Sequence, residues 1–329
     1  MSILKASSIS LDVGSGGHAS WEFFKDLRKI LKYTGKWTNT GDDAAVYNLG
    51  AKKLVMTTDA FIIDPIFFKG GDIGKIAMCG TINDISVMGA VPIGIALSLV
   101  IEEGFPTFDL ERILKSINKI SRETKVPVVT GDTKVTEKGK IDKIEITTAG
   151  IGTADKIIGN GNARPGDKII ASGNLGEHGA VILGQRFNYK TNLKSDSKPI
   201  LKEMQSVKSY LHAAKDPTRG GLSENLNEMA EKSKVKIVLD EKCLPYNKEA
   251  VAISDLLGIN LLALPSEGRF IASVPEKYAA KVVKKLQKFN REAKIIGEAE
   301  KGRGVYMKTA IGGLRPVEMP RGKLIPRIC

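Results

Sequence analysis

Two successive runs of alternating helix-like and strand-like segments constrain the fold of this chain more than any other feature. The first run has helical patterns at 21–31, 72–88 and 108–122 and strand patterns at 53–58, 93–100, 126–130 and 143–152. The second run has strand patterns at 168–171, 235–239 and 269–274 and helical patterns at 179–187, 201–213, 221–232 and 276–289. Between them, residues 159–167 are rich in glycine, asparagine and proline, which is typical of a domain boundary.

This pattern predicts two α/β domains and two flanking segments. We expect a glycine-rich segment at 1–20, an N-terminal domain at 21–158, a C-terminal α/β domain at 159–302 and a mobile tail at 303–329. A length of 329 residues is sufficient for two domains with substantial cores. The apolar stretch 85–101 is divided by Pro92, so we interpret it as the end of a helix, a turn and a buried strand from Ile93, and we expect no membrane association.

The charge and the cysteines narrow the class of protein. The formal net charge is +13, but the lysines are scattered, which favours a solvated surface first and acidic or phosphate-bearing partners second. Aromatic residues make up only 6% of the chain, so we expect no nucleic-acid stacking surface. Cys79, Cys243 and Cys329 show no CxxC spacing, which argues against a zinc site and favours a reducing, cytoplasmic setting. The sequence ends on Cys329, whose thiol is either part of a frayed end or a deliverable nucleophile.

Carboxylates recur at predicted strand ends and turns, where side chains from separate segments can converge. The groups are Gly41-Asp42-Asp43-Ala44-Ala45, Thr57-Thr58-Asp59, Asn83-Asp84, Gly131-Asp132-Thr133-Lys134 and Asp216-Pro217-Thr218-Arg219-Gly220-Gly221. Many aspartates and few histidines suit Mg²⁺, which takes oxygen ligands and bridges nucleotide phosphates. The glycines at 14, 16 and 17 and at 220–221 could offer backbone N–H groups to phosphate, although each motif alone is more often a turn or a linker. No Walker pattern is present, so we do not expect a P-loop protein.

Taken in order, these motifs resemble the ATP-using superfamily of aminoimidazole ribonucleotide synthetase, selenophosphate synthetase and thiamine-monophosphate kinase. Within it, the chain is similar to the HypE family of hydrogenase maturation factors. The resembling segments are 67–74, 131–135, 176–179, 216–222 and the terminal Pro326-Arg327-Ile328-Cys329. Selenophosphate synthetases normally carry cysteine or selenocysteine in the N-terminal glycine loop, which reads Gly14-Ser15-Gly16-Gly17 here. Lys215 departs from the arginine that the family often has before Asp216.

The resemblance implies an architecture and an assembly. It implies an α/β (α+β), two-domain synthetase-like fold, with N-terminal domains that pair into a dimeric β-barrel, a C-terminal α/β sandwich and a flexible tail. It also implies a homodimer that works with the carbamoyltransferase HypF and the HypC–HypD iron scaffold complex, and it implies no nucleic-acid partner.

The resemblance further implies a reaction. The thiol of Cys329 would receive a carbamoyl group, and the enzyme would dehydrate the S-carboxamide to an S-cyanate with ATP, supplying cyanide for the iron of NiFe hydrogenase. Lys134 would stabilise charge on the amide oxygen or the moving phosphoryl group, and Glu267 would act as the base. His178 is more readily interpreted as structural than catalytic.

The resemblance also implies the binding residues. Mg²⁺ would be held by Asp42, Asp59, Asp84 and Asp216. ATP and its phosphates would be bound by Gly14, Ser15, Gly16, Gly17, Asp43, Asn83, Asp132, Thr218, Arg219 and Gly220. Two alternatives stay open at this point: a kinase or synthetase of the same superfamily that does not use Cys329, and a basic nucleic-acid-binding protein.

Overall fold

The N-terminal half of the chain folds into one open, six-stranded sheet. The structure is a computed structural model that describes residues 8–321, 327 and 328. The sheet has the order β1-β2-β3-β8-β6-β7, and all neighbours are antiparallel except β6 and β7. Its strands are β1 (Trp37–Thr38), β2 (Ala45–Asn48), β3 (Lys53–Phe61), β6 (Val91–Glu102), β7 (Val128–Thr136) and β8 (Ile144–Ala154).

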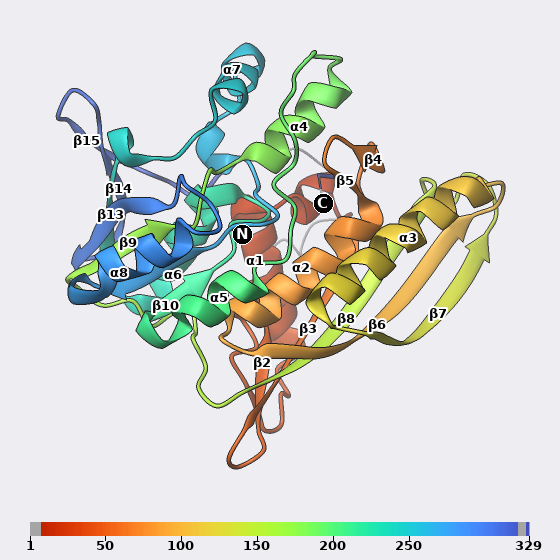
Figure 1. Cartoon of the computed structure of the whole chain (residues 1–329), viewed down its shortest axis with the longest axis horizontal. Coiled ribbons are helices and arrows are strands. Elements are labelled where there is room, and N and C mark those ends of the chain that lie inside the picture. Colours follow the sequence, from red (N-terminus) through yellow and green to blue (C-terminus); the bar gives the residue numbers. More distant parts are fainter. Residues whose placement is uncertain (1–7, 322–326, 329) are drawn as a thin grey trace.

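Two helices cover one face of this sheet. Figure 1 shows α2 (Ile73–Val87) against the sheet and α3 (Thr107–Thr124) beside it. Helix α2 is buried on nearly all sides, which explains why apolar residues occur around its whole circumference. Its first turn is fixed by Asp72, whose carboxylate accepts a hydrogen bond from the Lys75 N–H at 2.9 Å. The other face is open at the sheet edge, because every residue from Val128 to Val135 of β7 is exposed.

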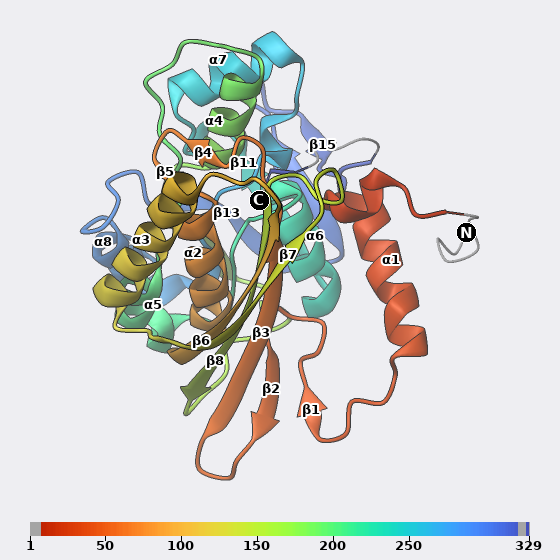
Figure 2. The same ribbon diagram turned by 90° about the vertical axis from the view of Figure 1, so that its right-hand side faces the viewer.

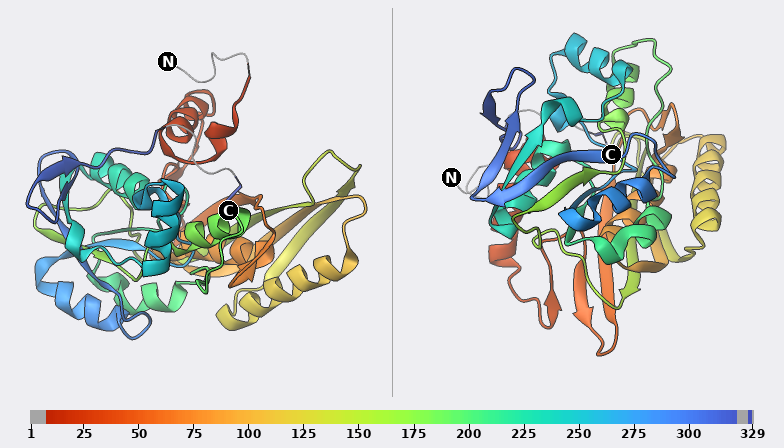
Figure 3. Two further views of the ribbon diagram at one scale, coloured as in Figure 1. Left: turned by 90° about the horizontal axis from the view of Figure 1, so that it is seen from above. Right: turned by 60° about the vertical axis from the view of Figure 1, so that its left-hand side comes forward.

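The C-terminal half forms a seven-stranded mixed sheet in the order β10-β12-β9-β13-β11-β14-β15. Only β11 and β14 are parallel neighbours. The strands are β9 (Asp167–Ala171), β10 (Ala213–Lys215), β11 (Val235–Asp240), β12 (Ile271–Pro275), β13 (Lys294–Lys301), β14 (Gly304–Lys308) and β15 (Leu314–Pro316). Helix α6 (Gly221–Ser233) packs on one face, and α5 (Leu201–Val207) and α8 (Glu276–Leu286) pack on the other (Figure 3). The sheet is therefore the middle layer of a sandwich.

One of the buried apolar clusters is shared by the two halves. Helix α4 (Glu177–Arg186), which packs against α7 (Lys248–Leu257), places Ala180 and Ile182 in the same buried cluster as Phe61 and Phe68 of the N-terminal half. Helix α1 (Gly17–Ile30) stands to one side of both sheets (Figure 2). The remaining elements are the hairpin β4 (Phe67–Phe68) and β5 (Gly71–Asp72) and the short 3-10 helices η2 (Leu11–Gly14), η3 (Lys208–Tyr210), η4 (Glu241–Cys243) and η5 (Leu261–Ala263).

The mixed α/β, two-domain architecture expected from the sequence is confirmed, but several local elements differ. The helix expected at 201–213 ends at Val207, because residues 213–215 pair with β12 as strand β10. Part of the segment expected to be a mobile tail is ordered instead, because residues 304–308 and 314–316 form β14 and β15 of the C-terminal sheet. The strand expected to be buried from Ile93 is exposed at Ile93 itself, since one face of β6 is uncovered. In the described part of the chain, no helix combines the length and the apolar character that crossing a membrane requires.

Candidate active site

An acidic cavity of about 650 Å³ lies where α1, β3, α2 and the segment before α6 meet. Five aspartates predicted to bind Mg²⁺ or ATP line it: Asp42, Asp43, Asp59, Asp84 and Asp216. Gly16, Thr218 and Arg219 line it as well. The structure therefore brings together side chains from segments that are distant in the sequence.

The spacing of residues on β3 and α2 explains how two of these carboxylates meet. Thr57 and Asp59 are two residues apart on a strand, so they face the same side of the sheet. Thr81 and Asp84 are three residues apart on a helix, so they share one face of it. The Thr81 hydroxyl lies 3.0 Å from the Asp59 carboxylate, and the Thr57 hydroxyl lies 2.9 Å from that of Asp84. The hydroxyl of Thr57 on the strand thus orients the carboxylate of Asp84 on the helix, and the hydroxyl of Thr81 on the helix orients the carboxylate of Asp59 on the strand.

The inner carboxylates repel one another. Burial raises the pKa of Asp84 well above its ordinary value, and the nearby charges of Asp59 and Asp216 raise it further. Burial, together with the charge of Asp43, raises the pKa of Asp216 to about 8. One carboxylate oxygen of Asp216 has no hydrogen-bond partner among the described residues. Such a cluster favours the uptake of protons or of a cation.

Two lysines neutralise the outer carboxylates. The Asp42 carboxylate lies 2.9 Å from the Lys232 ammonium, and the Asp43 carboxylate forms a close ion pair with Lys215. Lys215 also lies 3.5 Å from Glu228. Although burial lowers the pKa of Lys215, Asp43 and Glu228 raise it well above its ordinary value, so this amine stays charged. Lys215, which stands where the resembling proteins often have arginine, therefore also places a buried positive charge beside Asp43.

The raised pKa of Asp216 predicts that the ligand-free protein is less stable at higher pH. The folded state holds a proton up to about pH 8, whereas an unfolded aspartate loses it near pH 3.9, so stability falls as the pH rises between these values. We expect Asp216→Asn to flatten this dependence by up to about 1.4 kcal/mol per pH unit. Urea unfolding across this pH range measures it, with exposed Asp155→Asn as the control. Parallel stability curves for wild type and Asp216→Asn would contradict this assignment.

The cavity suits a magnesium ion that arrives with nucleotide phosphates rather than one held by protein alone. Among the described residues, no three acidic, histidine or cysteine side chains converge closely enough to hold a metal ion. Mg²⁺ is commonly bound by one or two carboxylates, with water and substrate phosphate completing its shell. The unpartnered oxygen of Asp216 and the repulsion among Asp59, Asp84 and Asp216 fit this mode of binding.

The glycine-rich loop packs directly on the turn before α6. Gly16 has a φ of +86°, and a Cβ atom there would lie 2.9 Å from the Gly220 nitrogen, so the two backbones approach as only glycine allows. The Gly16 N–H donates to the Ser20 hydroxyl, and the Gly17 N–H donates to the Glu224 carboxylate. The Arg219 guanidinium reaches the Gly14 carbonyl at 3.5 Å, and the Ser15 hydroxyl donates to Leu11. A phosphate at the amide of Gly17 would therefore replace the Glu224 carboxylate.

Glu267 lies at the interface of the two halves. Its side chain is 2% exposed, and one of its carboxylate oxygens has no partner among the described residues. Burial raises its pKa well above the ordinary value, and the charges of Asp216 and Asp196 add to this effect. The Glu267 N–H donates to the Asp196 carboxylate at 2.9 Å. This is the environment of a carboxylate that is a strong base once ionised.

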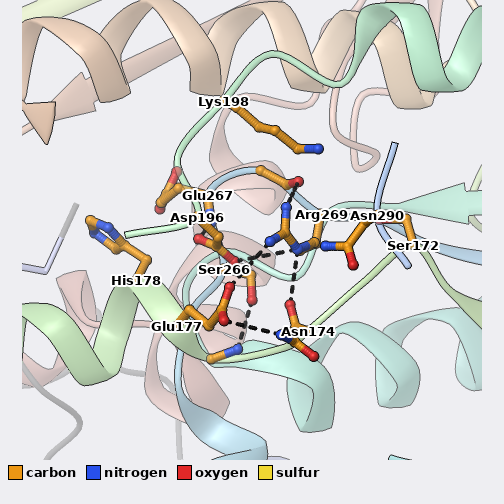
Figure 4. A network of polar contacts seen from close by, with 12 residues as sticks. Ser172, Asn174, Glu177, His178, Asp196, Lys198, Ser266, Glu267, Arg269 and Asn290 are labelled. Carbon is orange, nitrogen blue, oxygen red and sulfur yellow. Dashed lines mark hydrogen bonds and ion pairs between the residues drawn. The ribbon is translucent and has the colours of Figure 1, made fainter. Parts of the chain in front are cut away.

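A buried ionic network supports the segment that carries Glu267. Figure 4 shows Arg269 at its centre, with a hydrogen bond to the Asn174 carbonyl and ion pairs to Glu177 at 3.1 Å and Asp196 at 3.9 Å. Because the guanidinium is planar and permanently charged, it holds these groups in fixed directions. The network therefore restrains the backbone on both sides of Glu267.

The side chain of Asn83 connects the two halves through hydrogen bonds. Its side-chain amide donates to the carbonyls of Lys198 and Glu267, each at 3.1 Å, and its oxygen accepts from the Ile200 N–H at 2.9 Å. This buried side chain is occupied by protein contacts, whereas we expected it to bind ATP phosphate. Its phosphate contact stays a prediction that requires these bonds to change.

Lys134 and Asp132 lie apart from the acidic cavity in the single chain. Both are on the exposed strand β7, where the Lys134 side chain is 71% exposed and lies 3.1 Å from Asp132. They do not line the acidic cavity among the described residues. Asp132 instead lines a surface hollow with Leu97 and Leu99 of the neighbouring strand β6.

His178 lies at the start of α4, after a glycine turn, and its side chain is fully buried. Its ring contacts the ring of Phe68 edge-on, and burial lowers its pKa to about 4. Its Nε2 atom lies 2.7 Å from the carbonyl oxygen of Ile328. Cys329 itself lies outside the described residues.

Comparison with known proteins shows the family. The model of the N-terminal domain of AIR synthase related proteins matches residues 41–154, and that of the C-terminal domain matches residues 164–309. The carbamoyl dehydratase HypE of Cupriavidus necator is 40% identical over 338 residues, covering 99% of this chain and 96% of the relative. The chain belongs to the HypE family of carbamoyl dehydratases.

Two solved HypE structures show the same fold. A crystal structure of HypE in complex with ATP has a TM-score of 0.82 and 37% identity, covering 98% of this chain and 100% of that one. A crystal structure of a HypE–HypF complex has a TM-score of 0.85 and 34% identity, covering 91% and 100% of the two chains. The resemblance found in the sequence is thus confirmed at the level of the HypE family.

Several polar residues of this HypE-family site were not predicted from the sequence. Glu224, Glu228 and Lys232 lie on α6 at spacings of about one turn, which places them on one helix face towards the cavity. That spacing could have identified them. Asp196 and Arg269 gave no local signal, because their importance comes from contacts between distant segments.

Proposed function

We propose that this protein uses ATP to dehydrate an S-carboxamide on Cys329 to an S-cyanate, which supplies cyanide for the iron ligands of NiFe hydrogenase. The observation that carries this proposal is that an acidic cavity of about 650 Å³, lined by Asp216, lies near Glu267, a buried carboxylate with one oxygen that has no partner among the described residues. A phosphoryl-transfer site and a strong base are the two functions that the dehydration of an amide requires.

The proposed dehydration has two stages. The carboxamide oxygen attacks the γ-phosphorus of ATP, so that a C–O–P linkage forms and ADP leaves. The two N–H protons are then removed, the C–O bond breaks, phosphate departs and the carbon–nitrogen triple bond forms. The products are thiocyanate on the cysteine, ADP and phosphate. Glu267 is our candidate for the group that accepts a proton from nitrogen, because its environment raises its basicity.

We assign one set of cavity residues to the phosphates of ATP and another set to Mg²⁺. We assign Thr218 and Arg219, the turn at Gly220 and the loop from Gly14 to Gly17 to the nucleotide phosphates. Asp42, Asp59, Asp84 and Asp216 would hold Mg²⁺ directly or through water, with Asp43 fixed by Lys215 beside them. When bound, Mg²⁺ would neutralise charge on the phosphates. The protein's own contribution is to hold the carboxylates in place through the Thr57 and Thr81 hydroxyls.

We infer a homodimer in which the N-terminal sheets pair into a barrel. The support is the uncovered face of β7, where Val129 and Val135 are 62% and 67% exposed. Lys134 and Asp132 lie on the same strand, so their role in the reaction would depend on this pairing. We also propose HypF as the carbamoyl donor and the HypC–HypD complex as the cyanide acceptor, in line with the HypE–HypF complex of the related protein.

Infrared spectroscopy of the carbamoyl-loaded chain tests this function. Loading by HypF, followed by ATP, should produce a nitrile stretching band together with one ADP for each nitrile. ADP formation without a nitrile band, accompanied by phosphorylation of a small molecule, would instead favour a kinase or synthetase of the same superfamily.

We predict that Asp59→Ala and Asp84→Ala each abolish ATP hydrolysis by the loaded enzyme. Each change removes an oxygen ligand from the inner cavity, where the carboxylates have few other partners. ADP release and circular dichroism measure turnover and folding in the same preparation. The exposed Asp155→Ala serves as the control. Wild-type turnover in both folded variants would show that the metal site lies elsewhere.

A further inference from the structure

The carboxylate of Glu224 lies where the glycine-rich loop meets the first turn of α6. It accepts a hydrogen bond from the Gly17 N–H, although the two residues are 207 positions apart in the sequence. A Cβ atom added to Gly220 would lie 1.6 Å from a carboxylate oxygen of Glu224. The carboxylate therefore occupies space that exists only because residue 220 has no side chain.

This position has the features of an anion site. The backbone amides of a glycine loop and the positive end of a helix dipole both favour negative charge. Helix α6 is 13 residues long, and Glu224 is the acidic residue of its first turn. Glu224 is 8% exposed and lines the same acidic cavity as Asp216. A carboxylate of the protein itself thus stands where a phosphate would be well bound.

The ionised form of Glu224 depends on the loop. Burial raises the pKa of Glu224 to about 7, the hydrogen bond from Gly17 lowers it, and the charge of Glu228 raises it. Lys215 and Arg219 lower it further through their charges. A second anion at the Gly17 amide would remove the main stabilising contact of the buried carboxylate and would also repel it.

The next residue along α6 offers a donor instead. Asn225 is 2% exposed and lines the same cavity, and neither polar atom of its side chain has a hydrogen-bond partner among the described residues. Because an unpartnered buried amide costs free energy, such a group in a cavity wall points to a bound ligand as its partner. Its nitrogen can donate to the oxygens of a nucleotide, which the ionised carboxylate of Glu224 can only repel.

We propose that Glu224 is a competitor of ATP within the protein itself. Its carboxylate occupies the Gly17 amide in the nucleotide-free chain, a phosphate of ATP displaces it, and Glu224 thereby lowers the affinity for ATP. Asn225 has the opposite effect on affinity, because its amide gains a partner when the nucleotide binds. This inference rests on the proposed function, which assigns the loop from Gly14 to Gly17 to the nucleotide phosphates.

The affinity of the full-length chain for AMPPCP, a non-hydrolysable ATP analogue, tests this competition in the presence of Mg²⁺. Calorimetry at about pH 8 keeps the carboxylate of Glu224 mostly ionised. We expect Glu224→Ala to bind the analogue about tenfold more tightly, since no charged hydrogen bond has to be displaced. Asn225→Leu, which keeps a similar volume but removes the donor, should bind it up to about tenfold more weakly.

Two further variants separate this competition from a general effect of charge. Glu224→Asp keeps the charge but has a shorter side chain that no longer reaches the Gly17 amide, so it should tighten binding nearly as much as Glu224→Ala. Glu231→Gln is the matched control, because it removes the same charge from an exposed position of α6 outside the acidic cavity. Its affinity for the analogue should equal that of the wild type.

Hydrogen exchange of two neighbouring amides reports the displacement directly. The Gly17 N–H donates to Glu224, whereas the Gly16 N–H donates to the Ser20 hydroxyl at 2.8 Å and serves as the internal control. Without nucleotide, Glu224→Ala should accelerate exchange at Gly17 by about tenfold or more and leave exchange at Gly16 near the wild-type rate. AMPPCP should then restore the protection of Gly17.

The outcomes separate this inference from the proposed function. Wild-type or weaker affinity in Glu224→Ala would overturn the competition, as would a Gly17 amide that AMPPCP leaves unprotected in that variant. Tighter binding by Glu224→Ala with wild-type affinity in Glu224→Asp would reduce the effect to charge and overturn it as well. Wild-type affinity in Asn225→Leu would overturn the role of Asn225. A chain whose affinities follow the expected order, but which forms no nitrile after loading, would refute the proposed function and leave this inference standing.

Discussion

Removal of Cys329 alone should abolish nitrile formation while the protein still folds, dimerises and binds ATP. A side chain at the chain end contributes little to a core, whereas a cysteine thiol is the nucleophile that can carry the carbamoyl group. The other two cysteines are poor substitutes. Cys79 is fully buried, and burial strongly raises the pKa of its thiol, so it stays protonated and unreactive.

Cys243 provides the matched control for this experiment. It is partly exposed on η4 and lies outside the acidic cavity, so Cys243→Ser should keep wild-type activity. Thiocyanate can be quantified in the wild type, in Cys243→Ser and in the chain ending at Ile328. Full thiocyanate formation by the truncated chain would remove the basis of the proposed function.

Replacement of Glu267 by Gln should slow dehydration by about 10²–10⁴-fold, the range expected for loss of a general base. The amide keeps the shape of the side chain but accepts no proton. Because the pKa of Glu267 is raised by burial, its charged form destabilises the fold, and Glu267→Gln should be at least as stable as wild type at alkaline pH. The wild-type rate should rise with pH through a pKa above the ordinary range of glutamate, and this limb should vanish in the variant.

Glu203→Gln is the control that distinguishes a loss of stability from the loss of the catalytic base. Glu203 is also buried, near Arg269 of the ionic network that supports Glu267, but it forms an ion pair with Lys198. Its replacement should lower the free energy of unfolding, because Lys198 loses its partner, and should leave the chemical step intact. Thermal unfolding and single-turnover dehydration of both variants test this contrast. A Glu267→Gln variant with the wild-type rate would place the base elsewhere, and His178 is then a poor substitute because its nitrogens are both engaged.

Short-range patterns in the sequence were sufficient to predict most elements of the fold. The helix ending before Pro92 and the strand after it follow from local periodicity, and they correspond to α2 and β6. Strands β14 and β15 were assigned to the tail instead, because β14 is held by pairing with β11, which is distant in sequence, and β15 pairs in turn with β14. Helix α5 was predicted too long for the same reason, since strand β10 is defined by its partner β12.

The candidate site was predictable to a similar extent. Asp59, Asp84 and Asp216 were singled out as an ordered set of carboxylates, and the structure places them in one cavity. The pKa values of these carboxylates were not predictable, because they depend on which carboxylate forms an ion pair with a lysine in the folded chain. Asp43 pairs with Lys215, whereas one oxygen of Asp216 has no partner among the described residues. Asn83 was expected at the phosphates, but its amide connects α2 to the segments around Lys198 and Glu267. Such long-range contacts leave no pattern in the local sequence.

If Cys329 carries the carboxamide that ATP converts to a nitrile, intact mass spectrometry with peptide mapping will detect the conversion on the terminal peptide. HypF loading of the wild-type chain should add about 43 Da at Cys329, and ATP should then remove about 18 Da as water from the same residue. We expect both mass changes on the terminal peptide and neither on the peptides of Cys79 and Cys243. A loaded terminal peptide that keeps its full mass gain after ATP turnover, or loading at either of the other cysteines instead, would contradict it.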